Sequence, residues 1–227
     1  MSHLMFSKEL LQFMVTLAKN NNRDWFHEHK SDYKIHEVSA KTIFSYISDQ
    51  LNQHDVIDSF KLFRIYRDVR FSKNKLPYKT HISGSFKRKK PEFRGGYYLH
   101  IEPHNKSFIA TGFWNPDKTD LLRVRREFEQ DDQELRGIIN DIKFQSVWGT
   151  LQGDELKTAP RDFDKNHQAI DLIRKKQYIF TKQFTDNEVL DANFADTVVS
   201  AFHEIRPFFD YMTDVLTTNV NGESILK

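Results

Sequence analysis

The chain has 227 residues, of which 38% are hydrophobic, 29% are charged and 14% are aromatic. Glycine and proline number only 8 and 6, whereas phenylalanine numbers 20, so the composition excludes collagen-like and disordered chains. The absence of cysteine excludes disulfides, thiolate catalysis, iron–sulfur clusters and cysteine-based zinc sites. A globular fold of a single domain, residues 1–227, is therefore expected.

No stretch of the sequence reaches the run of about 18 apolar residues that a membrane helix needs. The first residues, Met1-Ser2-His3-Leu4-Met5, lack the basic and apolar regions of a signal peptide. We therefore predict a cytoplasmic protein with no membrane partner. Residues 1–5 are interpreted as a flexible start or a remnant of cloning.

The N-terminal part of the chain is predicted to be helical. Ser7 is a typical N-cap, and the apolar residues after it repeat at helical spacing up to Leu17. Three asparagines at 20–22 end this helix, because asparagine competes for backbone hydrogen bonds. A short helical turn is expected at residues 24–26, and a longer helix over about residues 32–52.

At Phe63 the apolar period changes to two and stays so up to Phe71. This alternation is typical of a strand and would place Arg64, Asp68 and Arg70 on one face. Arg67 would lie on the opposite face with the core residues, so it would be buried and need a carboxylate partner. Residues 72–85 are predicted to form an ordered loop.

A β-hairpin is predicted over residues 96–114, because two alternating segments flank a polar connection at 103–106. With a connection of four residues, Ile101 would face Phe108 in the core. His100 would then lie on the opposite face of the hairpin, away from that core.

The rest of the chain adds mostly helices. Helical spacing predicts a helix up to residue 139, with Asn115 as its cap and Pro116 in its first turn, and another near 168–175, followed by a strand near 178–184. A final helix over 194–216 is expected to kink at Pro207. This order predicts an α+β fold, a mostly antiparallel sheet packed with helices, in which the N-terminal helices and the long C-terminal helix close the core.

Charge is distributed unevenly, although the net charge is only +2. Residues 61–94 contain twelve Lys and Arg against two acidic residues, so this segment carries +10 and the remainder carries −8. Such an asymmetry attracts anions to one region of a protein surface.

A longer motif lies within this basic segment. Residues 63–81, Phe-Arg-Ile-Tyr-Arg-Asp-Val-Arg-Phe-Ser-Lys-Asn-Lys-Leu-Pro-Tyr-Lys-Thr-His, resemble the signature of an uncharacterised bacterial and fungal family labelled domain of unknown function 2461. The resemblance covers nearly the whole chain and includes residues 21–26, 96–103, 156–157, 160–161 and 206–208. It implies no reaction. Asp162 stands where the family usually has glycine, so no anion-binding role is transferred to Arg161.

The motifs of standard catalytic and nucleotide sites are missing from the sequence. It has no phosphate-binding loop, no dinucleotide-binding glycine motif, no serine-hydrolase elbow and no His-Glu-x-x-His. The histidines His27 and His29 would point to different sides of a helix, and the pair His100/His104, although four residues apart, is expected in a strand and a turn rather than on one helix face. We therefore predict no metal and no cofactor, and the sequence does not decide whether the protein is an enzyme.

The basic segment is the predicted functional site. Guanidinium groups suit bidentate binding of phosphate or carboxylate, and lysine adds a compact charge. We expect this segment to bind or process a phosphorylated or otherwise anionic small molecule, with Asp68 and His81 as candidates for proton transfer. The predicted ligand-binding residues are Arg64, Arg70, Lys75, Tyr78, Lys79, His81, His100 and Trp114.

Two alternatives stay open. The same basic stretch, extended by residues 87–90, could contact a nucleic acid. The arginines could instead serve the structure alone, paired in the sheet with Asp68 or Glu102, and Arg67 is the candidate for a buried pair. The sequence predicts no oligomeric state.

Overall fold

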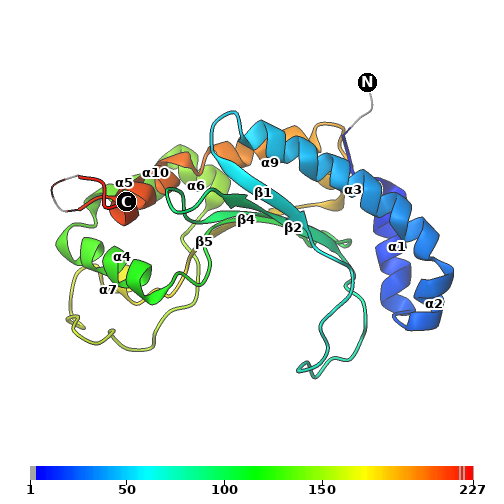
Figure 1. Ribbon diagram of the computed structural model, residues 1–227, viewed down its shortest axis with the longest axis horizontal. Coiled ribbons are helices and arrows are strands. Elements are labelled where there is room, and N and C mark those ends of the chain that lie inside the picture. The colour runs from blue at the N-terminus through cyan, green and yellow to red at the C-terminus, as the bar shows by residue number, and fades with distance from the viewer. Residues whose placement is uncertain (1–3, 220, 222, 227) are drawn as a thin grey trace. The chain divides into compact units, whose positions relative to one another are not determined.

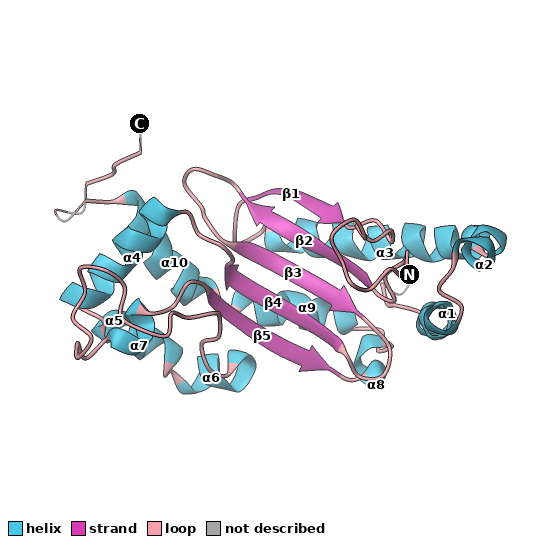
Figure 2. Cartoon of the chain, turned by 90° about the horizontal axis from the view of Figure 1, so that it is seen from below, coloured by secondary structure: helices cyan, strands magenta, loops and turns pink. Residues whose placement is uncertain are grey.

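The computed structural model describes residues 4–219, 221 and 223–226, so the first three of the residues interpreted as a flexible start lie outside it. Helices make up 44% of the described residues, and strands together with isolated bridges make up 18%; the strands form one antiparallel sheet in the order β1-β2-β3-β4-β5 (Figures 1 and 2). This confirms the predicted α+β class. The strands are β1 Ile57–Leu62, β2 Ile82–Arg88, β3 Gly96–Ile101, β4 Ser107–Phe113 and β5 Tyr178–Phe184.

The helices lie before, between and after the strands. In the first part of the chain they are α1 Lys8–Lys19, α2 Arg23–Glu28 and α3 Lys30–Leu51. The later ones are α4 Lys118–Gln130, α5 Gln133–Ile139, α6 Ile142–Trp148, α7 Ile170–Ile173, α8 Asp186–Val189, α9 Phe194–His203 and α10 Arg206–Thr217. Within the described residues, no helix is both long and apolar enough to span a membrane.

The chain forms two compact units, and β2, β3, β4 and β5 each contribute residues to both. The first unit contains the chain up to Lys87 together with Tyr98–Ile109 and Gln183–Ser200. The second contains Arg88–Tyr97, Ala110–Lys182 and the chain from Ala201 onward.

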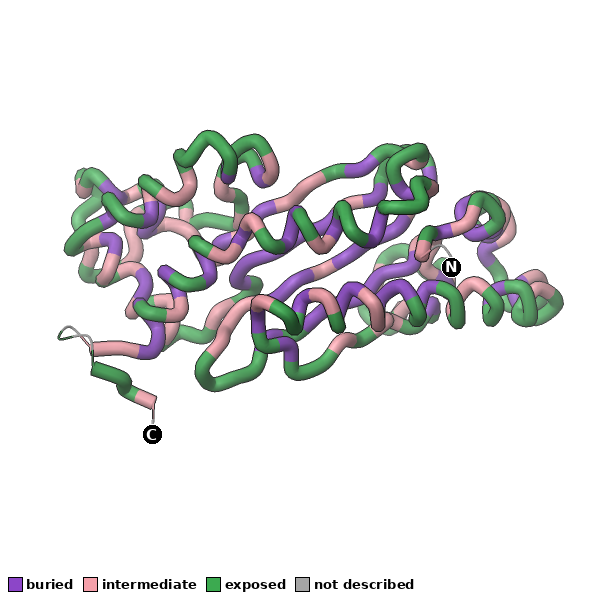
Figure 3. The backbone as a smooth tube through the Cα atoms, turned by 90° about the horizontal axis from the view of Figure 1, so that it is seen from above, coloured by how far each residue is buried: buried purple, intermediate pink, exposed green. Residues whose placement is uncertain are grey.

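In the first unit, helices cover one face of the strands. The Ser7 hydroxyl caps α1 by accepting from the backbone N–H of Leu10 at 3.2 Å, as predicted. Phe44 of α3 stacks on Phe86 of β2 with ring centroids 5.4 Å apart. Gly84 permits this approach, because a Cβ there would lie 2.6 Å from the Phe44 ring. Buried residues accordingly follow the strands and one side of the helices (Figure 3).

In the second unit, the aromatic residues of α9 and α10 form the core. Phe202 packs edge-on against Tyr97 of β3 at 4.8 Å, and Phe208 packs against Phe180 of β5 at 5.1 Å. The predicted single helix over 194–216 is two helices, because the chain turns at residues 204–205. Pro207 lies in the first turn of α10, where its missing N–H costs no hydrogen bond.

The predicted strand over residues 63–71 is wrong. The strand β1 ends at Leu62. After the Phe63 N–H, which donates to the carbonyl of Ser83 in β2 at 2.8 Å, the segment pairs with its own continuation through a bridge between Tyr66 and Tyr78. The backbone N–H of Lys79 donates to the carbonyl of Ile65 at 2.8 Å. Burial alternates along this loop, but Phe71 at its tip is 96% exposed, because no second layer covers it.

The hairpin of β3 and β4 is confirmed, but its predicted faces are shifted by one residue. The connection has five residues, 102–106, and His104 and Asn105 adopt positive φ angles in it. A connection longer by one residue exchanges the two faces of the second strand. Phe108 therefore stacks on His100 at 4.7 Å, and Ile109 takes the core position instead.

Candidate functional site

Several predicted ligand-binding cations are engaged within the loop of residues 63–81. The Arg70 guanidinium donates to both carboxylate oxygens of Asp68, at 3.0 and 2.6 Å. The Lys75 ammonium donates to the carbonyl of Val69 at 2.9 Å. These side chains are exposed and hold the loop in its own conformation, so an anionic ligand would have to displace these contacts to bind them.

Asp68, the first candidate for proton transfer, is paired rather than free. The hydrogen bond from Arg70 lowers the pKa of the Asp68 carboxyl, so the group is ionised at neutral pH. Arg64 is exposed, and its carbonyl accepts a hydrogen bond from the Lys79 ammonium at 3.0 Å. Burial lowers the pKa of Lys79, and the nearby charge of Arg64 lowers it further.

Tyr78 fixes the loop to the first helices. Its ring is buried and stacks on Phe26 of α2 with centroids 4.1 Å apart. The side chain of Asn21 bonds to both the N–H and the carbonyl of Tyr78, at 3.1 and 3.0 Å. Because both backbone groups are satisfied by one amide, the loop is attached to the turn between α1 and α2 at this residue.

The expectation that Arg67 is buried and paired is wrong. The side chain is half-buried, and no carboxylate of the described residues lies within ion-pair distance of it. The segment is a loop rather than a strand of the sheet, and although Ile65 reaches the core, Arg67 lies beside α2 instead. Arg67 is held by its backbone, whose N–H donates to the carbonyl of Pro77 at 2.9 Å.

Arg67 instead lines a hollow of about 510 Å³ between α2 and the loop. We call this hollow the basic hollow; it is lined by Arg23, Asp24, Phe26, His27, Lys30, Tyr66, Arg67, Val69, Pro77 and Tyr78. Three of these residues are permanent cations and one is a carboxylate. The sequence signal for it was the basic character of residues 61–94, but the contribution of α2 could not be read from that segment.

His81, the second candidate for proton transfer, lies directly before β2 and meets His100 of β3. The two imidazole rings have centroids 4.1 Å apart. Glu102 follows β3, and the period of a strand places it on the same face as His100 and Tyr98. We call His81, His100 and Glu102 the histidine–glutamate cluster. The sequence had suggested Glu102 only as a partner for arginine.

Hydrogen bonds order this cluster. Glu102 Oε2 lies 2.8 Å from His100 Nε2 and 4.0 Å from His81 Nδ1. The Tyr98 hydroxyl lies 3.0 Å from His100 Nδ1. Since a carboxylate only accepts, Nε2 of His100 carries a proton, and Nδ1 of the neutral ring accepts from Tyr98.

Both histidines are held in their neutral form. Burial lowers the pKa of His81 to about 3, and the charges of Lys79 and Arg67 act in the same direction. Burial also lowers the pKa of His100, against the opposing effect of Glu102. Neutral imidazoles keep a lone pair for a metal ion or a hydrogen-bond donor.

The histidine–glutamate cluster also has the geometry to hold a metal ion. One ligand atom from each of its three residues lies within 4.8 Å of the other two. Among the residues that the structure describes, no other group of three His, Asp or Glu is as compact. Sequence spacing missed it, because His81 is far from His100 along the chain and no motif joins them.

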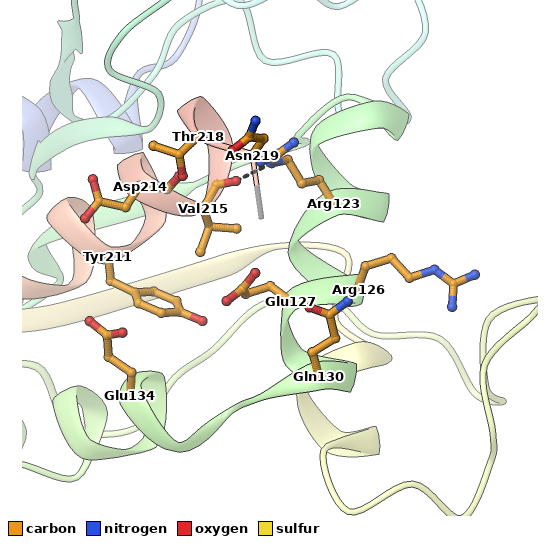
Figure 4. A pocket seen from close by; sticks show the side chains of 10 residues that line it. All are labelled: Arg123, Arg126, Glu127, Gln130, Glu134, Tyr211, Asp214, Val215, Thr218 and Asn219. Atoms are coloured by element: carbon orange, nitrogen blue, oxygen red, sulfur yellow. Dashed lines mark hydrogen bonds between the residues drawn. The ribbon is translucent and has the colours of Figure 1, made fainter. Parts of the chain in front are cut away.

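A second hollow, of about 550 Å³, lies in the second unit between α4 and α10 (Figure 4). Glu127, Glu134 and Asp214 line it together with Arg123 and Arg126. These carboxylates would repel an anion, so this hollow does not suit the predicted ligand. Burial raises the pKa of Glu127, and the neighbouring acidic residues add to the shift.

Trp114, predicted to line the site, follows β4 in the second unit and is 38% exposed. The side-chain oxygen of the next residue, Asn115, accepts a hydrogen bond from the side-chain amide of Gln177 at 2.9 Å. A role for Trp114 in ligand binding stays a prediction.

Comparison with known proteins gives a family but no activity. A model of the family described as conserved hypothetical protein (DUF2461) matches residues 9–211. The match covers most of the chain, so the protein belongs to this family, and the resemblance found in the sequence is confirmed. Neither a curated protein nor a solved structure matches the chain.

Proposed function

We propose that this member of the DUF2461 family binds a phosphorylated or otherwise anionic small molecule through its basic segment, with the charged group of the ligand in the basic hollow. The observation that carries the proposal is the gathering of three uncompensated cations, Arg23, Lys30 and Arg67, around one concave surface. Asp24 is the single carboxylate among the lining residues.

The three cations are available to a ligand. Within the described part of the chain, no carboxylate lies within ion-pair distance of Arg23, Lys30 or Arg67. A guanidinium or ammonium without a partner attracts anions more strongly than one that is already paired, because no internal contact has to be broken. Arg70 and Lys75, by contrast, would have to leave Asp68 and the Val69 carbonyl first.

Tyr66 is the aromatic residue of the hollow that can receive the uncharged part of a ligand, because Phe26 and Tyr78 are only 2% and 5% exposed. Phe26 and Tyr78 form a stacked pair, and Tyr66 is 45% exposed beside them. A volume of about 510 Å³ lies within the range of about 300 to 1,000 Å³ that small-molecule sites occupy. The combination favours an anion that carries a planar or apolar group over an inorganic ion alone.

The nucleic-acid alternative has less support. It needs Arg88 as part of an exposed basic run, but Arg88 is only 2% exposed. Its guanidinium lies 4.3 Å from the Phe209 ring centroid and donates to the carbonyl of Arg94 at 2.9 Å. The purely structural alternative accounts for Arg70, which is paired with Asp68, but not for Arg67.

Calorimetric titration with phenyl phosphate and with inorganic phosphate tests the proposal. Arg67→Gln and Arg23→Gln should each weaken binding by about tenfold, which corresponds to about 1.4 kcal/mol for one partly screened charge contact. Lys89→Gln is the matched control, since it removes one charge from an exposed position elsewhere. Phenyl phosphate should bind more tightly than inorganic phosphate.

Three results would contradict the proposal. One is the absence of saturable binding of either phosphate by the wild-type protein. Another is a loss of affinity in Lys89→Gln equal to that in Arg67→Gln, because the weaker binding would then follow from the lower net charge and not from a contact in the hollow. The third is preferential binding of an oligonucleotide with a log–log salt slope of about −3.5 to −5.5, the value for four to six phosphate contacts.

A further inference from the structure

In the histidine–glutamate cluster, His81 lies close to Glu102 without forming a hydrogen bond to it. Two neutral imidazoles and a carboxylate converge from the start of β2 and the end of β3, with ring centroids of His81 and His100 4.1 Å apart. His81 Nδ1 is 4.0 Å from Glu102 Oε2, which is too long for a hydrogen bond. We infer that His81, His100 and Glu102 form a binding site for a divalent transition-metal ion of the Zn²⁺ type.

The two distances from Glu102 to the imidazole nitrogens lie on either side of the ligand separation in a tetrahedral site. Bonds of about 2.0 to 2.1 Å from zinc to nitrogen or oxygen place neighbouring ligand atoms about 3.3 Å apart. The Glu102 oxygen lies 2.8 Å from one imidazole nitrogen and 4.0 Å from the other. Small rotations of His81 and Glu102 would make these two separations equal, and both side chains are about a quarter exposed, at 23% and 24%.

The ligand set selects the class of metal. Two imidazole nitrogens and one carboxylate oxygen suit Zn²⁺ and neighbouring ions such as Co²⁺ and Ni²⁺. Ca²⁺ and Mg²⁺ prefer six or more oxygen ligands, which this cluster does not offer. Three protein ligands leave one position of a tetrahedron for water or a ligand, as in catalytic rather than structural zinc sites.

The surroundings of His100 provide the support that a metal-binding histidine needs. Phe108 stacks on the ring at 4.7 Å, and Tyr98 bonds to Nδ1 at 3.0 Å. A metal at Nε2 requires the other tautomer of the neutral ring, in which the single ring proton has moved from Nε2 to Nδ1 and is donated to the Tyr98 oxygen. Glu102 is positioned by its backbone N–H, which donates to the Ser107 hydroxyl at 3.0 Å.

Nearby cations oppose the metal and favour an anion as its fourth ligand. The charges of Lys79 and Arg67 act on His81 and would repel a dication. An anion at the open position would offset this repulsion. The inference goes beyond the proposed function, because none of the three ligands lines the basic hollow.

Titration of chelator-treated protein with Zn²⁺ tests the inference. We expect one ion per chain, with Glu102→Gln and His81→Ala each weakening binding by at least about 100-fold, since even an outer-shell partner is worth 10- to 100-fold. Tyr98→Phe should weaken it by about tenfold. Glu102→Gln keeps the shape of the side chain, so it stays informative if a variant of the buried His100 does not fold.

The control is His104→Asn, which removes an exposed histidine from the same hairpin and keeps a residue that tolerates its positive φ angle. It should leave Zn²⁺ affinity unchanged. Nitrogen-15 spectra should show the His100 proton moving from Nε2 to Nδ1 when the metal binds.

Two results would overturn the inference. The first is the absence of stoichiometric Zn²⁺ binding below about 10 µM, which corresponds to about −7 kcal/mol. The second is binding that Glu102→Gln and His81→Ala leave unchanged, because the metal would then lie elsewhere. Arg67→Gln distinguishes the two sites, since it should weaken phenyl phosphate without weakening Zn²⁺.

Discussion

Replacement of Arg67 by alanine separates a stabilising role of this side chain from a ligand-binding role. Truncation of one partner of a buried ion pair costs about 3 to 5 kcal/mol, because the other charge is left unpaired. Arg67 is half-buried and has no ion-pair partner among the described carboxylates. Its backbone bond to Pro77, at 2.9 Å, survives the change. Only the contact of its aliphatic stem is lost, which amounts to about 0.5 to 1 kcal/mol.

Urea unfolding followed by circular dichroism measures this difference. With a slope of about 2 to 3 kcal/mol/M, a loss of 1 kcal/mol lowers the midpoint by about 0.3 to 0.5 M. Lys73→Ala, in the exposed part of the same loop, should change the midpoint by less than about 0.2 M. A fall of 1 M or more for Arg67→Ala would mean that the side chain has a buried partner, and the reasoning about the basic hollow would fail.

Three further predictions concern the fold. Gly112→Ala should abolish or severely weaken folding, measured by thermal unfolding, because its φ angle is +127° and a Cβ would lie 2.1 Å from the carbonyl oxygen of Tyr178; a melting temperature equal to wild type would contradict this. Burial opposes ionisation of Asp171, but the hydrogen bonds and charge of Arg136 outweigh it and lower the pKa of this carboxyl. Asp171→Asn should therefore lower stability above the ordinary pKa of 3.8, and the difference should shrink as the pH falls through the lowered value; a constant difference would refute the pairing. Burial raises the pKa of Glu127 above its ordinary value of 4.5, so the folded state loses stability as the pH rises from 4.5 through the raised pKa and the carboxyl ionises. Glu127→Gln should therefore raise the free energy of unfolding at pH 7 but not at pH 3, and equal stability of the two proteins at pH 7 would contradict this.

The helices and the fold class could be predicted from the sequence because their signals are local. Ser7 and the apolar stripe up to Leu17 give α1 its start and its buried side, and the structure places both as expected. The final helix shows the limit of such signals. Helical spacing continues through residues 204–205, and only the tertiary packing reveals that the chain turns there.

The alternation at residues 63–71 predicted a strand for a physical reason that also applies to some loops. A segment that lies against α2 on one side and solvent on the other alternates in burial, whether or not it joins a sheet. Strand pairing depends on which backbone segment lies alongside, and the local sequence pattern does not determine this. The same limit explains the hairpin, where one additional residue in the connection exchanged the faces of β4.

The candidate site was only partly accessible to sequence reasoning. His81 and His100 were predicted as ligand-binding residues, and they do lie together. Glu102 lies two residues after His100, so the strand period places both side chains on one face. The sequence contains this spacing, but it does not show that His81 lies beside them. Arg23 and Lys30 were missed because α2 and the start of α3 approach the loop in space and not along the chain.

The central claim is that an anion binds in the basic hollow, and side-chain NMR of the arginine Nε–H groups during titration with phenyl phosphate tests it most directly. The account predicts saturable shifts for Arg23 and Arg67, with no comparable shift for Arg70, whose Nε–H already donates to Asp68 at 3.0 Å. Saturable shifts confined to Arg70 or to arginines outside the hollow, or no saturable shift at all, would contradict it.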